Sequence, residues 1–261
     1  MSEMTISNRV GWAAFDALTM ARRNLKIWFK VPAFIVFTII QPVMFTLLFR
    51  YVFGGAIATG AQGGYVDYLL PGVIGQTAAF TSFGTAISLA MELKTGVLDR
   101  LRAMPIARSA VLLGRLGADI VRLLVTLIII VGVGYAVGFR FHGGVLAAIA
   151  MFGLALLLGL VTCCLSAFIG LAIKDEESVQ AFGLIWVFPL TFVSSAFVPT
   201  QSMPGWMQAF ANNQPITQIV DAMRALALGT STGNHVWVGI LWMLGLMGLF
   251  IPLAVRAYRK A

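Results

Sequence analysis

The sequence alternates between long apolar stretches and short charged ones. Six stretches free of Asp, Glu, Lys and Arg cover residues 31–49, 68–91, 123–139, 145–173, 179–198 and 236–254. A hydrocarbon core of about 30 Å is crossed by roughly 20 helical residues, so each stretch is long enough or nearly so. Their apolar residues are continuous and do not alternate, which excludes transmembrane strands. The pattern therefore predicts an all-α integral membrane protein with six transmembrane helices.

The segment before the first apolar stretch, residues 10–30, is amphipathic. Polar residues recur every three or four positions on one helical face, while apolar residues including Trp28 occupy the other. A basic helix of this kind lies at the membrane interface, and we expect Arg22, Arg23 and Lys26 to anchor it there. It is either a simple anchor for the first span or a lever close to a partner that docks on the same membrane face.

Composition and charge agree with a lipid environment. Of the 261 residues 59% are hydrophobic and 11% are charged, with a mean hydropathy of +0.92, whereas soluble domains carry about 25% charged residues. The net charge of +8 needs no nucleic acid partner, because Lys and Arg concentrate in cytoplasmic loops. With the N-terminus inside, only Arg50, Arg140 and Arg224 fall outside. Both termini are thus predicted to be cytoplasmic, and residues 1–261 to form a single membrane domain.

The loop between the second and third stretches, residues 92–110, concentrates charge in an otherwise uncharged region. Its distinctive residues are Glu92, Gly96, Asp99, Arg100, Arg102, Pro105 and Arg108. A helical charge cluster followed by a proline predicts a short helix. Leu98, Leu101 and Met104 would form an apolar ridge suited to a groove on a soluble partner. The alternative is an ordinary positively charged cytoplasmic loop.

Residues 199–233 lie between the fifth and sixth stretches and are rich in apolar side chains. Pro204, Pro215 and Gly229 divide them into two helices too short to span a membrane. We expect two external re-entrant or interfacial half-helices that carry Trp206, Asp221 and Arg224, with the amides of residues 212–214 satisfying the turn between them. The alternative is a simple external loop.

Polar side chains are sparse within the apolar stretches, and none is acidic. A proton- or sodium-coupled carrier needs such a buried carboxylate, so an ion-coupled carrier is disfavoured. Gln41, Gln76 and Phe83 are candidates for lining a substrate path, although helix–helix packing also explains them.

Three groups of residues together resemble one family. They are Glu92…Gly96…Asp99-Arg100…Pro105…Arg108…Gly114-Arg115, then Gln41-Pro42 leading to Gly54-Gly55, and Phe197-Val198-Pro199 followed by Met203-Pro204-Gly205-Trp206 and Asn213-Gln214-Pro215. This order resembles type-2 ABC exporter permeases, and most closely the daunorubicin-resistance, polyketide-drug exporter branch. The resemblance covers essentially the whole chain.

The resemblance implies partners. In similar permeases the loop of residues 92–110 forms a coupling helix that docks on a separate ATP-binding subunit, present in two copies. Two permease chains, identical or related, pair in a bacterial inner membrane, and hydrophobic, drug-like, polyketide or lipid cargo passes between them. We expect no cofactor or metal on this chain, and ATP with Mg²⁺ on the partner subunit. The chain has no Gly-rich loop ending in Gly-Lys-Ser/Thr, in agreement with a separate motor.

Two other functions compete with drug or lipid export. One is a permease for lipid-linked polysaccharide, which an aromatic belt along the path would favour. The other is an intramembrane enzyme such as a serine protease, which needs a nucleophile and a base in one cavity. The two histidines, His142 and His235, fall at predicted outer loop edges, and no Gly-x-Ser-x-Gly motif occurs. An enzyme is therefore disfavoured, with no catalytic residue assigned.

Overall fold

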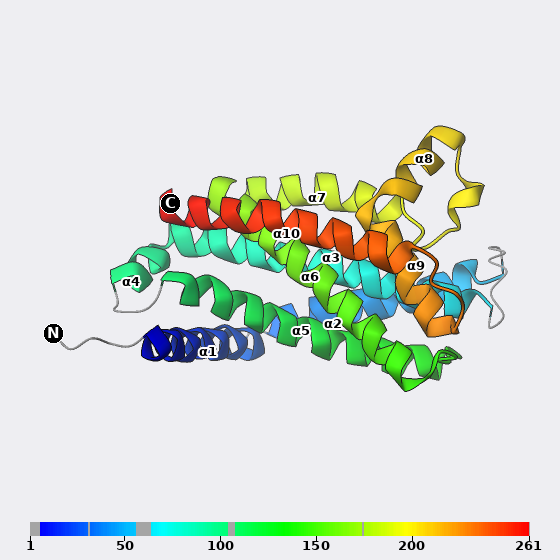
Figure 1. Ribbon diagram of the computed structural model, residues 1–261, viewed down its shortest axis with the longest axis horizontal. Coiled ribbons are helices and arrows are strands. Elements are labelled where there is room, and N and C mark those ends of the chain that lie inside the picture. The colour runs from blue at the N-terminus through cyan, green and yellow to red at the C-terminus, as the bar shows by residue number, and fades with distance from the viewer. Residues whose placement is uncertain (1–5, 31, 56–63, 104–107, 174, 261) are drawn as a thin grey trace.

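The computed structural model describes residues 6–30, 32–55, 64–103, 108–173 and 175–260, and within them the chain is helical with no β-strand. Long helices run side by side along the longest axis of the molecule (Figure 1). The elements are α1 (Ile6–Lys30), α2 (Pro32–Leu48) with the π-helical continuation η1 (Phe49–Phe53), α3 (Tyr65–Lys94), α4 (Val97–Ala103), α5 (Arg108–Ala136), α6 (Gly144–Ile173), α7 (Glu176–Phe192), the 3₁₀ turn η2 (Thr200–Ser202), α8 (Gly205–Asn213), α9 (Pro215–Leu228) and α10 (His235–Lys260).

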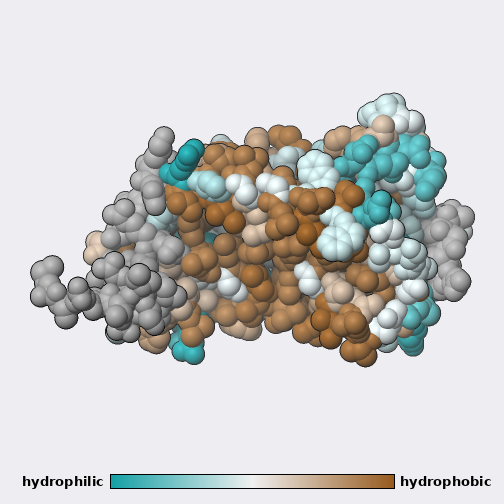
Figure 2. All heavy atoms as spheres, viewed as in Figure 1, coloured by the Kyte–Doolittle hydropathy of each residue, from teal (hydrophilic) through white to brown (hydrophobic). Residues whose placement is uncertain are grey.

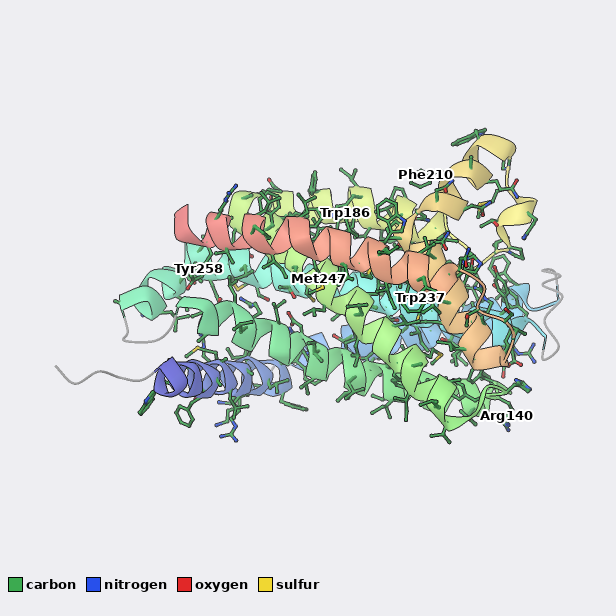
Figure 3. All side chains as sticks on the ribbon, in the orientation of Figure 1. Arg140, Trp186, Phe210, Trp237, Met247 and Tyr258 are labelled. Atoms are coloured by element: carbon green, nitrogen blue, oxygen red, sulfur yellow. The ribbon has the colours of Figure 1, made fainter. Side chains whose placement is uncertain are left out.

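The bundle has two distinct ends. The α4 end holds α4, the beginning of α5 and the last turns of α3 and α10, with α1 beside α5 (Figure 1). The α9 end holds α8, α9 and the turn between α5 and α6. Tyr258 and Arg140 lie at these opposite ends (Figure 3). The C-terminal end of α10 and the charged α4 region therefore share one end of the molecule.

In the described part of the chain, four helices are long and apolar enough to cross a membrane: Tyr65–Lys94, Ala110–Ala136, Gly144–Ile173 and His235–Tyr258. The first predicted stretch forms α2 and η1, which contain the shorter apolar segment Thr38–Phe53, and the fifth forms α7, of 17 residues. Apolar residues cover the middle of the visible face and hydrophilic ones gather toward the ends (Figure 2). Such a belt is the surface expected of a protein surrounded by hydrocarbon.

Helix α7 ends six residues before the end of the fifth predicted stretch. Its last turn contains Pro189, and the helix stops at Phe192. The chain then turns back beneath α9, where Ala196 and Phe197 are buried. The approach to α3 is so close that a Cβ at Gly72 would overlap the carbonyl oxygen of Ala196. The apolar pattern continued past the helix because this turn is itself buried by protein.

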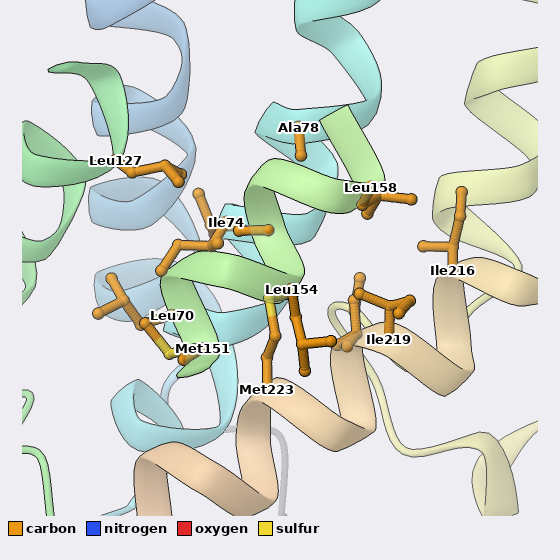
Figure 4. Close-up of a cluster of buried hydrophobic side chains, with 14 of the residues drawn as sticks. Leu70, Ile74, Ala78, Leu127, Met151, Leu154, Leu158, Ile216, Ile219 and Met223 are labelled. Atoms are coloured by element: carbon orange, nitrogen blue, oxygen red, sulfur yellow. The ribbon is translucent and has the colours of Figure 1, made fainter. Parts of the chain in front are cut away.

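The main core joins α3, α6 and α9, with α5 and α10 around it. Figure 4 shows Ile74 of α3, Leu154 and Leu158 of α6 and Ile219 and Met223 of α9 packed together. Small residues let these helices approach closely, and a Cβ on one glycine of α3 would overlap a valine methyl group of α9. Close contact through small residues is typical of helix packing in membranes, where van der Waals contact replaces the hydrophobic effect.

Helix α1 packs along the first half of α5. A Cβ at Gly114 would lie 2.5 Å from Met20 Cβ and 2.6 Å from the carbonyl oxygen of Ala17, so this glycine permits the contact. Trp28 is buried, whereas Trp12 and Phe15 are 64% and 63% exposed. Helix α1 therefore has one face against the bundle and a second apolar face free to contact lipid.

Candidate functional site

The apolar side of α4 is used within the chain. Leu98 is fully buried and Leu101 is 5% exposed, in a second core cluster with Met20, Leu171 and Tyr258. The prediction of an exposed Leu98–Leu101 ridge is therefore wrong: these side chains close the α4 end of the bundle. Met104, its third predicted member, lies outside the described residues.

The residues predicted to dock a partner differ in how far the structure describes them. Arg100 is exposed on α4, and Gly96 directly precedes the helix with a φ of 68°, a left-handed conformation that glycine adopts without strain. Pro105 lies outside the described residues. For three more the structure describes the backbone in α4 and α5 but not the side chains: Asp99, Arg102 and Arg108. The seventh residue, Glu92, lies on α3.

Glu92 is the centre of an ion-pair triad that joins three helices. Its Oε2 lies 2.8 Å from Arg115 Nη1 on α5, and its Oε1 lies 3.1 Å from Arg23 Nη2 on α1. The side chains of Glu92 and Arg115 are 14% and 9% exposed, against 32% for Arg23. Charged hydrogen bonds in such a sheltered place are stronger than exposed ones. The triad thus fixes the amphipathic helix to the end of α3, while Arg22 and Lys26 remain exposed on α1.

A second buried charge pair lies about one turn deeper along α5. Asp119 is 1% exposed, pairs with Arg122 three residues later, and accepts a 2.6 Å hydrogen bond from the Thr85 hydroxyl of α3. The same hydroxyl lies 3.7 Å from the sulfur of Cys163 on α6. A buried carboxylate is stable only when paired and hydrogen-bonded, and both conditions hold here. The pair therefore holds α3, α5 and α6 together.

A cavity of about 430 Å³ opens beside both charge groups, between α1, α2, α3 and α5. Gln41 of α2 and Gln76 of α3 line it, together with Trp28 of α1. Phe83 is not among the lining residues; its ring lies against Gly183 of α7, where a Cβ would overlap it. The lining reaches from Gln76 to Glu92, 16 residues or about 24 Å of helix. The volume is in the range of sites that bind drug-sized ligands.

At the α9 end, Arg224 joins α9 to α3. Its Nε donates to the carbonyl oxygen of Tyr68 at 3.1 Å, its Nη2 donates to that of Ser195 at 2.7 Å, and its guanidinium lies 3.6 Å from the centre of the Tyr68 ring. Asp221 pairs with the same guanidinium and accepts a 2.7 Å hydrogen bond from the Ser195 hydroxyl. Both predicted residues therefore lie in one buried network that holds α9 in place.

The two short helices of residues 199–233 form where the sequence predicts them. Pro204 caps α8, Pro215 is the first residue of α9, and Gly229 ends α9 with a φ of 69°. Of the amides expected to satisfy the turn between α8 and α9, Asn213 donates to the carbonyl oxygen of Ala209 in α8, whereas Gln214 Nε2 donates to two carbonyl oxygens at the end of α7. Trp206 is 75% exposed on α8. This side chain is free to contact a membrane interface or a partner.

The spacing of Asp119 and Arg122 on one face of α5 indicates their pairing, but sequence reasoning missed the partners of the buried charges that lie on other helices. Arg115 lies 23 residues from Glu92, and Thr85 lies 34 residues from Asp119. No short spacing links such residues, since they meet only when three helices adopt the right rotation about their axes. The usable signal was the presence of charged residues on α5 in a chain that otherwise avoids them.

The apolar belt, the four spanning-length helices and the sheltered charges around a cavity define a multi-pass helical membrane protein with an amphipathic site. The model of the ABC-2 type transporter family matches residues 16–228. The chain therefore belongs to the ABC-2 type transporter family.

Curated relatives match the chain over three quarters of its length or more. It is 33% identical over 248 residues to the daunorubicin resistance ABC transporter permease protein DrrB1 of Streptomyces coeruleorubidus, covering 95% of this chain and 87% of the relative. It is 28% identical to the probable doxorubicin resistance ABC transporter permease protein DrrC of Mycobacterium tuberculosis, covering 94% and 89%. A putative transport permease of Cyanophora paradoxa, ycf38, is 25% identical over 75% of this chain and 68% of its own length. These matches confirm the resemblance to drug-resistance ABC permeases.

Proposed function

We propose that the chain is the membrane-spanning permease subunit of an ATP-driven ABC exporter that moves hydrophobic or amphipathic cargo out of the cytoplasm or the inner leaflet of a bacterial inner membrane. The cavity carries this proposal, because it combines apolar walls with sheltered polar groups and reaches from the middle of the bundle to its α4 end. Family membership and relatives named for daunorubicin and doxorubicin resistance support drug-like, polyketide or lipid cargo.

The proposed topology has six crossings, made by α2, α3, α5, α6, α7 and α10, with the α4 end in the cytoplasm. The excess of Lys and Arg in the segments assigned to that side supports this orientation. In the same topology α8 and α9 are the external half-helices, and Gln214 supports their re-entrant role by satisfying backbone carbonyls where α7 ends. The whole chain then forms one permease domain.

The motor is a separate ATP-binding subunit in two copies, which carries ATP and Mg²⁺, and a second permease chain completes the path. Helix α4 is the proposed contact with the motor. With Leu98 and Leu101 buried, its outer side presents Arg100. A charged side chain at the rim of a docking surface, such as Arg100, can orient the partner as it approaches the helix.

Affinity purification of the full chain from its native membrane in mild detergent, with mass spectrometry of bound proteins, tests this function. We expect a stoichiometric ATP-binding subunit, and we expect Arg100→Glu to remove it while the variant stays folded. The matched control is Arg140→Glu, which reverses an exposed arginine at the α9 end. A chain that purifies without an ATPase would contradict the proposed function, and an ATPase retained equally by both variants would contradict docking through Arg100.

A further inference from the structure

Several residues that line the cavity carry buried nitrogen atoms that the protein leaves unpaired. Within the described part of the chain, four buried side-chain nitrogens of its lining residues have no hydrogen-bond partner: Trp28 Nε1, Gln76 Nε2, Arg115 Nε and Arg122 Nε. Trp28 is 4% and Gln76 is 3% exposed. All four atoms are N–H donors, and a buried donor without an acceptor costs free energy. Among the described residues, the protein itself supplies no acceptor for these four nitrogens.

The charged side chains at the cavity carry more positive than negative charge. Arg23, Arg115 and Arg122 line it, with Glu92 as the carboxylate among the described lining residues. Both Glu92 oxygens are already paired, and the two oxygens of Asp119 behind the wall are engaged by Arg122 and by a threonine hydroxyl. Three guanidinium groups thus face two carboxylates, which leaves one positive charge in excess. All four carboxylate oxygens are already engaged, so neither carboxylate has an oxygen left to bind a cation.

Part of the remaining wall is apolar, and hydroxyl and amide side chains form the rest. Ile27, Pro42, Phe80, Ile87 and Met91 line the cavity beside the charged groups. A ligand that fits both parts has an anionic group for the arginines and an apolar body for these side chains. An ammonium group would instead meet the arginines with like charge, which disfavours binding.

We propose that this cavity binds an amphiphile with an anionic head group, such as a phosphate or carboxylate. The proposal deepens the proposed function by naming the substrate class of the same site, and rests on it. The head group pairs with the arginines, and the apolar body packs on α2 and α3.

The test uses two photoreactive probes with the same diazirine-bearing twelve-carbon chain, one with a phosphate head and one with a trimethylammonium head. The purified full chain, in neutral detergent, is labelled and the modified peptides are mapped by mass spectrometry. We expect saturable labelling of residues 76–91 by the phosphate probe, with an apparent affinity at least about tenfold tighter than that of the ammonium probe. Equal labelling by both probes, or preference for ammonium, would overturn the proposal.

Two variants locate the site. A Cβ at Gly84 would meet no heavy atom within 4 Å, and Gly84 lines the cavity, so Gly84→Leu places an apolar side chain in the site. Gly132 on α5 is equally open and lies away from the lining, so Gly132→Leu is the matched control. We expect the first to abolish labelling by the phosphate probe and the second to preserve it. Labelling insensitive to Gly84→Leu would refute this location.

Two further results separate the alternatives. Inorganic phosphate at the concentration of the phosphate probe should not displace the probe. Full displacement would show that the site binds free anions and would refute binding of an amphiphile. The binding assay needs no ATPase. If the chain retains its ATP-binding subunit but labels equally with both head groups, the proposed function stands and the anionic ligand is refuted. If the chain discriminates between the head groups but purifies without an ATPase, the anionic ligand stands and the proposed function is refuted.

Discussion

Removing the charge of Glu92 should destabilise the fold, because the triad is largely buried. In Glu92→Gln the pair with Arg115, whose side chains are 14% and 9% exposed, loses its negative partner. Breaking a buried ion pair costs about 3–5 kcal/mol, and glutamine retains one acceptor oxygen, so we expect the lower end, about 3 kcal/mol. The pair with Arg23, whose side chain is 32% exposed, adds less than about 1 kcal/mol.

A double-mutant cycle separates the two pairs. Stability is measured as reversible unfolding of the purified chain in mixed micelles, followed by circular dichroism and by tryptophan fluorescence. We expect a coupling energy of about 2 kcal/mol between Glu92→Gln and Arg115→Met, and less than about 1 kcal/mol between Glu92→Gln and Arg23→Met. The control is Glu177→Gln, an exposed carboxylate in the first turn of α7, with a change within about 1 kcal/mol.

The cycle also distinguishes an internal role of Glu92 from a docking role. A stability of Glu92→Gln within about 0.5 kcal/mol of wild type, or strict additivity with Arg115→Met, would refute the reasoning from burial. If Glu92 instead contacted a partner subunit, the variant would retain its stability and lose the ATPase, as expected for Arg100→Glu. The two residues should therefore respond in opposite ways to the same two measurements.

Three further changes test other parts of the fold. Gly72→Ala forces a methyl group into the carbonyl oxygen of Ala196 and should lower the free energy of unfolding by about 1–3 kcal/mol, with no loss refuting the close approach. Arg224→Met removes the link between α9 and α3 and should cost about 3 kcal/mol in the same assay; a cost below about 1 kcal/mol would contradict its burial. The Ser178 backbone N–H holds the pKa of Asp175 below its ordinary value, so this N-cap stabilises the fold above the ordinary carboxyl pKa and is lost as pH falls through the lowered one. Wild type should then lose more stability than Asp175→Asn between about pH 7 and pH 3, and parallel curves would exclude this cap.

The sequence was sufficient for local structure. Pro204, Pro215 and Gly229 marked the limits of α8 and α9, because a proline can begin a helix and a glycine in a left-handed conformation can end one. The fourth apolar stretch, residues 145–173, forms the single helix α6. Gln41 and Gln76 were found as cavity residues because amides are costly in an apolar helix unless they have a partner or a ligand.

The position of Phe83 and the pairing of Glu92 could not be predicted in this way. The direction of each side chain depends on a neighbouring helix as well as on its own, because the rotation of the neighbouring helix decides which residues it meets. Phe83 faces away from the cavity because Gly183 leaves room for its ring on α7. Glu92 faces inward because Gly114 lets α1 approach α5 and brings Arg23 into reach. Small residues at helix contacts therefore decide which side of a helix lines the path.

The apolar side of α4 shows the same limit of sequence reasoning. An amphipathic pattern states that a side chain must be buried, but not by which chain. Leu98 and Leu101 satisfy the pattern by packing against α1, α6 and α10, which leaves the charged side of α4 as the surface for a partner. A motor that moves α4 would then also move the core beneath it, including the end of α3 that carries Glu92. Through the triad, the same movement reaches α1 and Arg115 in the wall of the cavity. Burial of the leucines thus provides a direct mechanical connection between the proposed docking helix and the proposed binding site.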